Sequence, residues 1–359
     1  MKALLFLPDI SGFTDFIQNT EIEHSQHVIQ ELLDVLIQSN IENMELAEVE
    51  GDALFFYKEE LPSYENLLAQ VEHMYTAFYS HLELLRKNRV CPCNACSKAP
   101  QLELKIIIHC GEIKYLTLQN KRKPFGKEVI QLHRLLKNSV ESDNYVIMTS
   151  SLIEAYQINK EESSSLFDFQ DGVDTYDNQE IDYLYTKINK QNLTLKPYAF
   201  AYKVDLKSSP TFKVTLPINA PLIDVMEHIT NYKYRHEWAE GVDKYEYNED
   251  EVTRLGTKHV CVINGDHLNF TTITKDVNEE GVEVYGEMTD TAPVAKKIYT
   301  FYLFKKLSDF KTHLTIEVHL QPKNFLNKLA IFFLIKRIFK RNTFKNLGKL
   351  KLLLESIDK

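Results

Sequence analysis

Two aspartates stand where a carboxylate could do chemistry. Asp9 directly follows an apolar run and precedes Ser11 and Gly12, and Asp52 lies at the tip of a predicted hairpin. A glycine turn before a helix aims backbone N–H groups at one point, where the helix dipole adds positive potential. Polyphosphate would suit that point, with a hard cation on the carboxylates, and two such tips side by side would form a two-metal site. The alternative is turn chemistry, because Asp is common at strand ends.

A second candidate site is a cluster of three cysteines, Cys91, Cys93 and Cys96. Closely spaced thiolates suit a structural Zn²⁺, which needs a fourth ligand. Candidates for that ligand are Cys110, His109 and His81. The alternative is a loop with free thiols. Five cysteines without a secretion signal do not indicate a disulfide framework, and we expect a cytoplasmic protein.

Strands and helices must position these groups. Residues 2–7 read as a buried strand, and helical spacing begins near Thr14 and continues to Ile37. The following elements are a hairpin over 44–57, a helix over 64–86, a strand over 102–109 and a helix over 127–138. This alternation predicts an α/β sandwich over residues 1–204.

The pattern changes after residues 205–210, DLKSSP, which form the best linker. A strand at 213–217 and short helices within 221–238 come next. Five strand candidates follow, near Val260, Thr272, Val284, Phe301 and Leu314, and a long amphipathic helix starts at about Asn324. A chain of 359 residues is too long for one ordinary core, so we expect a second domain over 211–359.

Charge is unevenly distributed. Residues 323–359 carry ten Lys and Arg against Glu355 and Asp358, although the net charge of the chain is −9. The acidity of the remainder argues against a nucleic-acid binder. The basic helix over 325–354 fits peripheral contact with an anionic membrane, or equally a helix that packs on its own sheet with a solvated basic face. The second alternative is favoured.

Four motifs in order resemble the class III adenylate/guanylate cyclase catalytic domain. They are DISGFT at 9–14, EVEGDALFF at 48–56, IHCGE at 108–112 and FGKEV at 125–129, followed by Arg134. A related group of unknown function carries the same core with a CxCxxC insert. The resemblance covers residues 1–204 and implies a ferredoxin-like α/β sandwich.

The resemblance also implies roles for individual residues. Asp9, Asp52 and the backbone of Ile10 would bind two Mg²⁺ or Mn²⁺ ions. The phosphate loop would be Ser11, Gly12, Phe13 and Thr14. Arg134 would stabilise charge on the α-phosphoryl group in the partner's site of a homodimer, and the products would be a cyclic nucleotide and pyrophosphate.

The sequence departs from the family at the position of the ribose-orienting asparagine, which is Ile130, and at the two base-reading positions, which are Glu48 and Lys123. A carboxylate could accept the N1–H and N2–H of guanine, whose O6 could accept from Lys123. Alternatively, Glu48 and Lys123 form an ion pair in a pocket that reads no base.

Residues 211–359 resemble the START-like helix-grip superfamily of polyketide-cyclase and lipid-transfer relatives. FKVTLPINAP at 212–221, the helix over 222–232 and His236-Glu-Trp238 carry this resemblance. It implies an apolar cavity for a hydrophobic small molecule or lipid, with walls from Trp238, Phe270, Tyr285 and Phe301. Three hypotheses follow. They are a purine nucleotide cyclase regulated by that ligand, a nucleotide-binding module without turnover, and an interaction protein with both pockets vacant.

Overall fold

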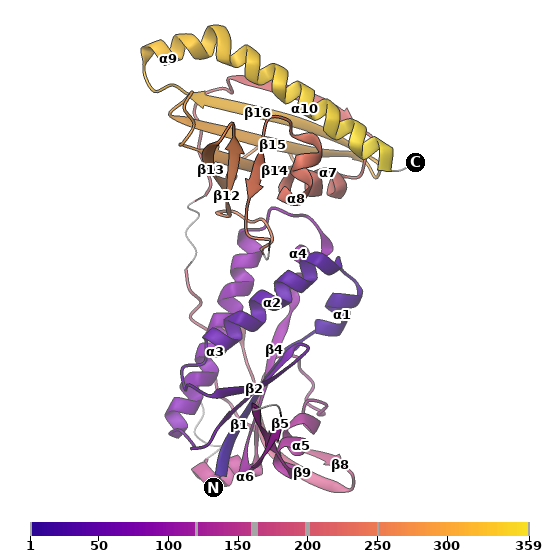
Figure 1. Ribbon diagram of the computed structural model, residues 1–359. Coiled ribbons are helices and arrows are strands. Elements are labelled where there is room, and N and C mark those ends of the chain that lie inside the picture. Colours follow the sequence, from indigo (N-terminus) through magenta and orange to yellow (C-terminus); the bar gives the residue numbers. More distant parts are fainter. Residues whose placement is uncertain (1, 119–120, 159–163, 198–201, 250, 358–359) are drawn as a thin grey trace. The chain divides into compact units, whose positions relative to one another are not determined.

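The computed structural model describes residues 2–118, 121–158, 164–197, 202–249 and 251–357 (Figure 1). Its fold is mixed α/β, with two compact units. Unit 1 comprises Met1–Arg86 and Lys98–Pro197, and unit 2 comprises Lys87–Ser97 and Tyr198–Lys359. This division differs from the predicted one, because the segment with the three cysteines belongs to unit 2, which also begins before the predicted linker.

Unit 1 is built on a seven-stranded sheet in the order β2-β3-β1-β4-β7-β9-β8. The strands are β1 (Lys2–Ser11), β2 (Glu45–Glu50), β3 (Ala53–Lys58), β4 (Glu103–Glu112), β7 (Tyr145–Thr149), β8 (Gln170–Tyr176) and β9 (Gln179–Lys187). β1 lies antiparallel between β3 and β4. The order β4-β1-β3-β2, with helices crossing between strands, is the ferredoxin-like split βαβ arrangement that the sequence predicts.

The helices of unit 1 differ from the predicted ones in length. The expected first helix is two helices, α1 (Phe13–Gln18) and α2 (Ile22–Gln38), and the helix expected over 127–138 is the shorter α5 (Lys127–Arg134). α3 (Tyr64–Lys87) confirms the helix expected over 64–86, whereas α6 (Ser150–Tyr156) is a helix that the sequence analysis did not predict. The short elements are α4 (Asn94–Lys98), η1 (Ala99–Gln101), η2 (Lys190–Asn192) and the small hairpin of β5 (Lys114–Leu118) and β6 (Lys121–Phe125).

Unit 2 is an antiparallel sheet in the order β10-β16-β15-β14-β13-β12-β11. Its strands are β10 (Phe212–Ile218), β11 (Lys244–Glu246), β12 (Lys258–Ile263), β13 (Asp266–Ile273), β14 (Val282–Thr289), β15 (Lys297–Ser308) and β16 (Lys311–Gln321). Two helices, α7 (Leu222–Thr230) and α8 (Tyr232–Trp238), separate β10 from β11. From β11 to β16 each strand pairs with the next one in sequence, so these strands form a meander, and β10 is the edge strand beside β16.

A long C-terminal helical segment lies along one face of this sheet, in yellow in Figure 1. It consists of α9 (Phe325–Ala330), the π-helical η3 (Ile331–Ile335) and α10 (Lys336–Ile357). Its inward side chains Ile331, Leu347, Leu350 and Leu354 are buried in one cluster with Val214 and other sheet residues. The order of elements is the one expected for a helix grip, whereas membership of the START-like superfamily stays a prediction.

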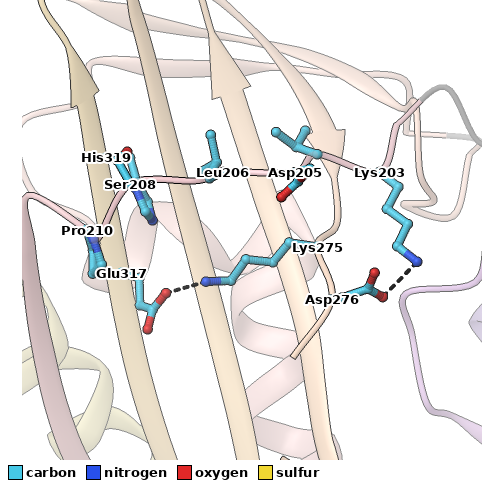
Figure 2. A pocket seen from close by; sticks show the side chains of 10 residues that line it. Lys203, Asp205, Leu206, Ser208, Pro210, Lys275, Asp276, Glu317 and His319 are labelled. Atoms are coloured by element: carbon cyan, nitrogen blue, oxygen red, sulfur yellow. Dashed lines mark hydrogen bonds and ion pairs between the residues drawn. The ribbon is translucent and has the colours of Figure 1, made fainter. Parts of the chain in front are cut away.

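The predicted linker packs on the opposite face of the same sheet. The Val204 N–H donates to the Thr274 carbonyl at 2.8 Å, and Leu206 packs against the cluster around Tyr299 and Phe301. Figure 2 shows residues 203–210 beside a pocket of about 350 Å³ that Lys275 and Glu317 also line. Residues 204–210 are therefore part of unit 2.

Candidate functional site

Asp9 lies near the end of β1, on the sheet face that also carries Leu5 and Leu7, because side chains alternate along a strand. Its side chain is largely buried. Lys105 is its register partner on β4, and the Lys105 Nζ lies 2.8 Å from the Asp9 Oδ2. The carboxylate thus enters the edge of an apolar core, with one cation beside it.

Asp52 lies in the turn between β2 and β3, where Gly51 adopts a φ of +67°. The Ile10 N–H donates to the Asp52 carbonyl at 3.2 Å, which ties this turn to β1. Burial, then the negative charge of Asp9, and a hydrogen bond between the two side chains raise the pKa of Asp52 from 3.8 to about 7. The structure therefore brings the two predicted carboxyl groups together.

The glycine bend of the predicted phosphate loop adjoins this pair. Gly12 has a φ of +86° and precedes α1, which begins at Phe13 and includes Thr14. Ser11 shares the strand face of Asp9, and its Oγ is buried with no hydrogen-bond partner among the described residues. The Ile10 side chain is buried in the core, so only its backbone is available to a ligand.

This donor set fits a divalent cation. Among the described residues, Lys105 is the cation that contacts Asp9, and burial, followed by the negative charge of Asp9, raises the pKa of Asp52. The buried Ser11 hydroxyl has no hydrogen-bond partner among the described residues. Mg²⁺ and Mn²⁺ prefer oxygen ligands of this kind. A bound divalent ion would supply the missing positive charge.

An apolar groove of about 430 Å³ lies next to the Asp52 turn. It is lined by residues of α1, α2, β2 and the β2–β3 turn, including Phe13, Ile29, Leu33, Val49 and Gly51. An apolar hollow with a few polar groups at its edge is the usual form of a small-molecule site.

The predicted base-reading residues form an ion pair. The Lys123 Nζ lies 2.7 Å from the Glu48 Oε1, between β6 and β2, and both side chains are about 40% exposed. This is the geometry of the simpler of the two sequence interpretations. It leaves base recognition as a proposal, because an exposed pair can open to a ligand.

Arg134 ends α5 and forms an ion pair with Asp177 in the turn between β8 and β9. Its side chain is 41% exposed. Ile130, one turn earlier on the same helix, is also exposed. Within the chain, then, Arg134 is held by an acid of its own unit, at the surface.

Sequence reasoning missed Lys105. A signal was present, because Lys105 is the only charged residue in the apolar run Leu104–Ile108 and lies opposite Asp9 in an antiparallel pair. A cation inside a buried strand indicates a buried acid nearby, since an unpaired charge there would be costly.

The IHCGE motif at the end of β4 contacts helix α5 and strand β7. The His109 Nε2 lies 2.8 Å from the Glu128 Oε2 on α5, and its Nδ1 lies 2.8 Å from the Thr149 Oγ1 on β7. A Cβ on Gly111 would fall 2.6 Å from the Glu128 side chain, so glycine permits this approach. Burial lowers the pKa of His109, although Glu128 opposes that shift.

The three candidates for a fourth zinc ligand all have partners within unit 1. His109 contacts Glu128, the Cys110 thiol donates to the Ser151 carbonyl at 3.1 Å, and His81 lies 3.0 Å from Glu31. Their predicted role as ligands gains no support from this geometry.

The three clustered cysteines belong to unit 2. Cys91, Cys93 and Cys96 are buried, and their Sγ atoms lie within 4.8 Å of one another. Hydrogen bonds from Cys93 and Cys96, together with burial, raise the pKa of the Cys91 thiol far above its usual range. Three converging sulfur atoms fit a soft-ligand metal such as Zn²⁺, whose charge would favour the thiolates.

The predicted walls of the hydrophobic pocket do not line one cavity. Trp238 and Tyr285 are buried in the core under the C-terminal helix, whereas Phe301 is buried in a cluster with Tyr299. Phe301 and Tyr302 are neighbours on β15 and point to opposite faces, so Phe301 lies on the far side of the sheet. Phe270 is half-buried and borders a separate hollow of about 480 Å³ over β12 and β13.

Unit 2 also buries a charged network that the sequence did not reveal. Arg235 of α8 donates to both carboxylate oxygens of Glu287 on β14, at 2.7 and 3.2 Å. The Tyr285 hydroxyl donates to the same carboxylate at 2.6 Å. Burial opposes ionisation of Glu287, but the Arg235 charge outweighs it and the pKa of Glu287 is lowered.

Comparison with known proteins adds two partial matches. A family described as proteins of unknown function (DUF2652) matches residues 29–145, a range that contains Asp52, Lys105 and the three cysteines but not Asp9. An uncharacterised protein of Mycobacterium tuberculosis is 30% identical over 119 residues, which are 33% of this chain and 56% of the relative. The chain thus spans about half the length of the curated relative.

Several solved structures are similar to about half of the chain. The catalytic core of a rhodopsin-guanylyl cyclase bound to ATPαS is 12% identical, covers 52% of this chain and 97% of its own, and gives a TM-score of 0.39. The adenylyl cyclase CyaB of P. aeruginosa is 17% identical, with coverages of 53% and 95% and a TM-score of 0.38. The guanylate cyclase domain of RhGC from Catenaria anguillulae, bound to GTP, is 13% identical, with coverages of 52% and 97% and a TM-score of 0.37.

Proposed function

We propose that unit 1 is a divalent-metal-dependent purine nucleotide cyclase, which converts a nucleoside triphosphate into a cyclic nucleotide and pyrophosphate. The convergence of Asp9 and Asp52 beside the Gly12 bend carries the proposal, because under-compensated carboxylates next to a glycine turn suit a metal-bound triphosphate. The sequence motifs point to the same chemistry.

Each residue of the site has a part in this proposal. Asp9 and Asp52 hold two Mg²⁺ or Mn²⁺ ions, with the Ile10 backbone as a further ligand, and residues 11–14 receive the phosphates. Metal ions of this kind supply charge neutralisation and lower the pKa of the ribose 3′-hydroxyl. The Ser11 hydroxyl, unsatisfied in the described structure, gains a partner when phosphate or metal binds.

A homodimer would complete the site. Arg134 is exposed and ends its helix, so a second copy could receive it. In this proposal Arg134 exchanges Asp177 for the α-phosphoryl group of the partner's substrate, where an arginine stabilises developing charge. Glu48 and Lys123 would open their ion pair to read guanine.

A second function is a nucleotide-binding module without turnover. Ile130 favours it, because an exposed isoleucine offers no hydrogen bond to orient a ribose. The Glu48–Lys123 ion pair favours it too, because the pair already satisfies both groups.

Purified protein incubated with Mn²⁺ and either ATP or GTP separates these functions. Mass spectrometry should detect a cyclic nucleotide, which Asp52→Ala abolishes. Asp182→Ala is the matched control, because this aspartate is exposed on β9 of the same unit. Nucleotide binding without product would support the module, and binding of neither nucleotide would refute both functions.

Two further proposals concern unit 2. Cys91, Cys93 and Cys96 hold a structural Zn²⁺. Metal analysis should detect zinc in the natural protein and not in Cys93→Ser, and a protein that purifies without zinc in reducing buffer contradicts this.

The helix-grip unit carries a hydrophobic small molecule or lipid that regulates unit 1. Native mass spectrometry should reveal such a ligand in the purified protein, and a bare chain that also binds no added lipid argues against it.

A further inference from the structure

The outer side of the C-terminal helical segment is unusually apolar. Phe325, Leu326, Phe332, Phe333 and Leu334 are all at least 60% exposed, and Phe344 is 60% exposed further along. The rings of Phe332 and Phe333 meet edge to face, with centroids 5.0 Å apart. Several large apolar side chains exposed on one short segment, unlike single scattered ones, usually mark an interaction site.

These side chains are not needed to hold the helix on the sheet. The packing is made by the other side of the same segment, where Ile331, Leu347 and Leu350 are buried. The segment is therefore apolar on two sides, one of which is already used by the core. The sequence analysis treated packing on the sheet and contact with a membrane as alternatives, but a segment with one buried and one exposed apolar side is compatible with both.

The surroundings of the exposed patch are strongly basic. Residues 323–354 contain nine Lys and Arg and no Asp or Glu. Lys345 and Lys349 pair with Glu240 of the same unit. Arg337, Lys340 and Arg341 are exposed and have no acidic partner within the described residues.

We propose that α9, η3 and the first turns of α10 dock on an anionic lipid surface. Phe325, Leu326, Phe332 and Phe333 enter the boundary between headgroups and acyl chains, and the cations near them meet the lipid phosphates. Apolar insertion combined with basic side chains is how interfacial helices bind anionic bilayers. In this proposal the segment lies in the plane of the surface, as interfacial amphipathic helices do. Among the described residues no helix is long and apolar enough to cross a membrane.

Charge favours this occupant over a second copy of the chain. A two-fold contact would place this basic segment against its own copy, which has no Asp or Glu over residues 323–354, and like charges repel. An anionic bilayer has the opposite charge and also accepts the aromatic rings. The proposal does not depend on catalysis by unit 1.

The test is vesicle flotation of the full-length protein. The protein should float with vesicles of phosphatidylcholine mixed with phosphatidylglycerol, and should stay at the bottom of the gradient with pure phosphatidylcholine. Added salt should weaken binding, because it screens the attraction between cations and lipid. Equal binding to both vesicle types would overturn the role given to the cations, and binding to neither would overturn the proposal.

Substitutions separate the two contributions. Phe332→Ser/Phe333→Ser should lower partitioning by on the order of 100-fold, because two large apolar side chains no longer enter the bilayer. Lys340→Gln/Arg341→Gln should lower it by about 30-fold on anionic vesicles only. Matched controls are Phe310→Ser and Lys258→Gln, since both residues are exposed elsewhere in unit 2.

A second variant guards against misfolding. Phe333→Trp keeps an aromatic ring at the patch, and its fluorescence should shift to the blue when anionic vesicles are added, while the buried Trp238 gives a constant background. A missing shift overturns the proposal. Sedimentation equilibrium tests the alternative that a second copy of the chain covers the patch. That alternative would hold if the protein forms a dimer, if Phe332→Ser/Phe333→Ser dissociates this dimer, and if the protein does not bind vesicles.

Discussion

The two units bury charge in opposite ways. In unit 2, Arg235 and Glu287 satisfy each other through two hydrogen bonds, and a tyrosine hydroxyl adds a third. In unit 1, Asp9 and Asp52 share the single cation Lys105, and the pKa of Asp52 rises to about 7 because of burial and then Asp9. In the unit 2 cluster one positive charge faces one negative charge, whereas in the unit 1 cluster two carboxyl groups lie near one lysine.

This difference separates structural charge from functional charge. A balanced buried pair with satisfied hydrogen bonds has no further ligand to attract. Two buried carboxyl groups near one lysine, with the Ser11 hydroxyl unsatisfied among the described residues, would be stabilised by a bound cation. The difference supports our proposal that the unit 1 carboxylates bind a ligand, and it gives the unit 2 network a structural role.

The largest expected effect is on the unit 2 network. Arg235→Met should lower the free energy of unfolding by about 3–5 kcal/mol, because it leaves Glu287 buried without its partner. Urea denaturation followed by circular dichroism measures this loss.

The double variant Arg235→Met/Glu287→Met should be more stable than Arg235→Met, since it removes both charges. Arg86→Met is the control, because the Arg86–Glu83 pair lies on the surface of α3 and contributes little. If the double variant is the less stable one, the pair is not a self-contained structural unit and the comparison fails.

The next effect concerns Asp52 and pH. Its pKa is about 7 in the folded protein against 3.8 ordinarily, so the folded state retains a proton that the unfolded chain releases. Stability from this group is therefore full below about pH 4 and declines as pH rises toward 7. Asp52→Asn should remove the decline, and thermal unfolding at about pH 5 and about pH 8 measures it.

A bound metal ion should also offset the loss of stability that ionisation of Asp52 causes at high pH. Mn²⁺ at about pH 8 should raise the melting temperature of the natural protein but not that of Asp52→Asn, because the ion needs the ionised carboxylate. A variant that still responds to Mn²⁺ would show that Asp52 is not a ligand.

The smallest change in stability is expected at the Glu48–Lys123 ion pair. Both side chains are substantially exposed, so Glu48→Lys/Lys123→Glu should leave the melting temperature almost unchanged. The same swap should shift nucleotide preference from GTP toward ATP in competition binding if the pair reads the base. An unchanged nucleotide preference would show that the Glu48–Lys123 pair does not read the base.

Sequence reasoning anticipated much of unit 1. The alternation of strands and helices, the hairpin that carries Asp52 and the glycine bend at Gly12 are local patterns, which a single sequence displays. The meeting of Asp9 and Asp52 is not local. It was inferred from the cyclase resemblance and depends on β1 pairing with β3.

The sequence analysis missed features that depend on strand register, on the two faces of a sheet and on contacts between distant segments. Lys105 could have been read as the partner of a buried acid, but its register with Asp9 had to be seen. Phe301 was grouped with Trp238 although it faces the opposite side of the sheet. Arg235 and Glu287 are 52 residues apart, and ordinary composition gave no sign that they meet.

The π-helical turn at Ile331–Ile335 sets which way α9 faces. A π turn accommodates one residue more than an α turn, and each residue rotates a helix by about 100°. Loss of one residue from this turn would therefore rotate Phe325 and Leu326 by a quarter turn or more about the helix axis relative to α10. Insertion or deletion of a single codon could thus redirect the exposed aromatic surface during evolution, while the packing of α10 on the sheet is preserved.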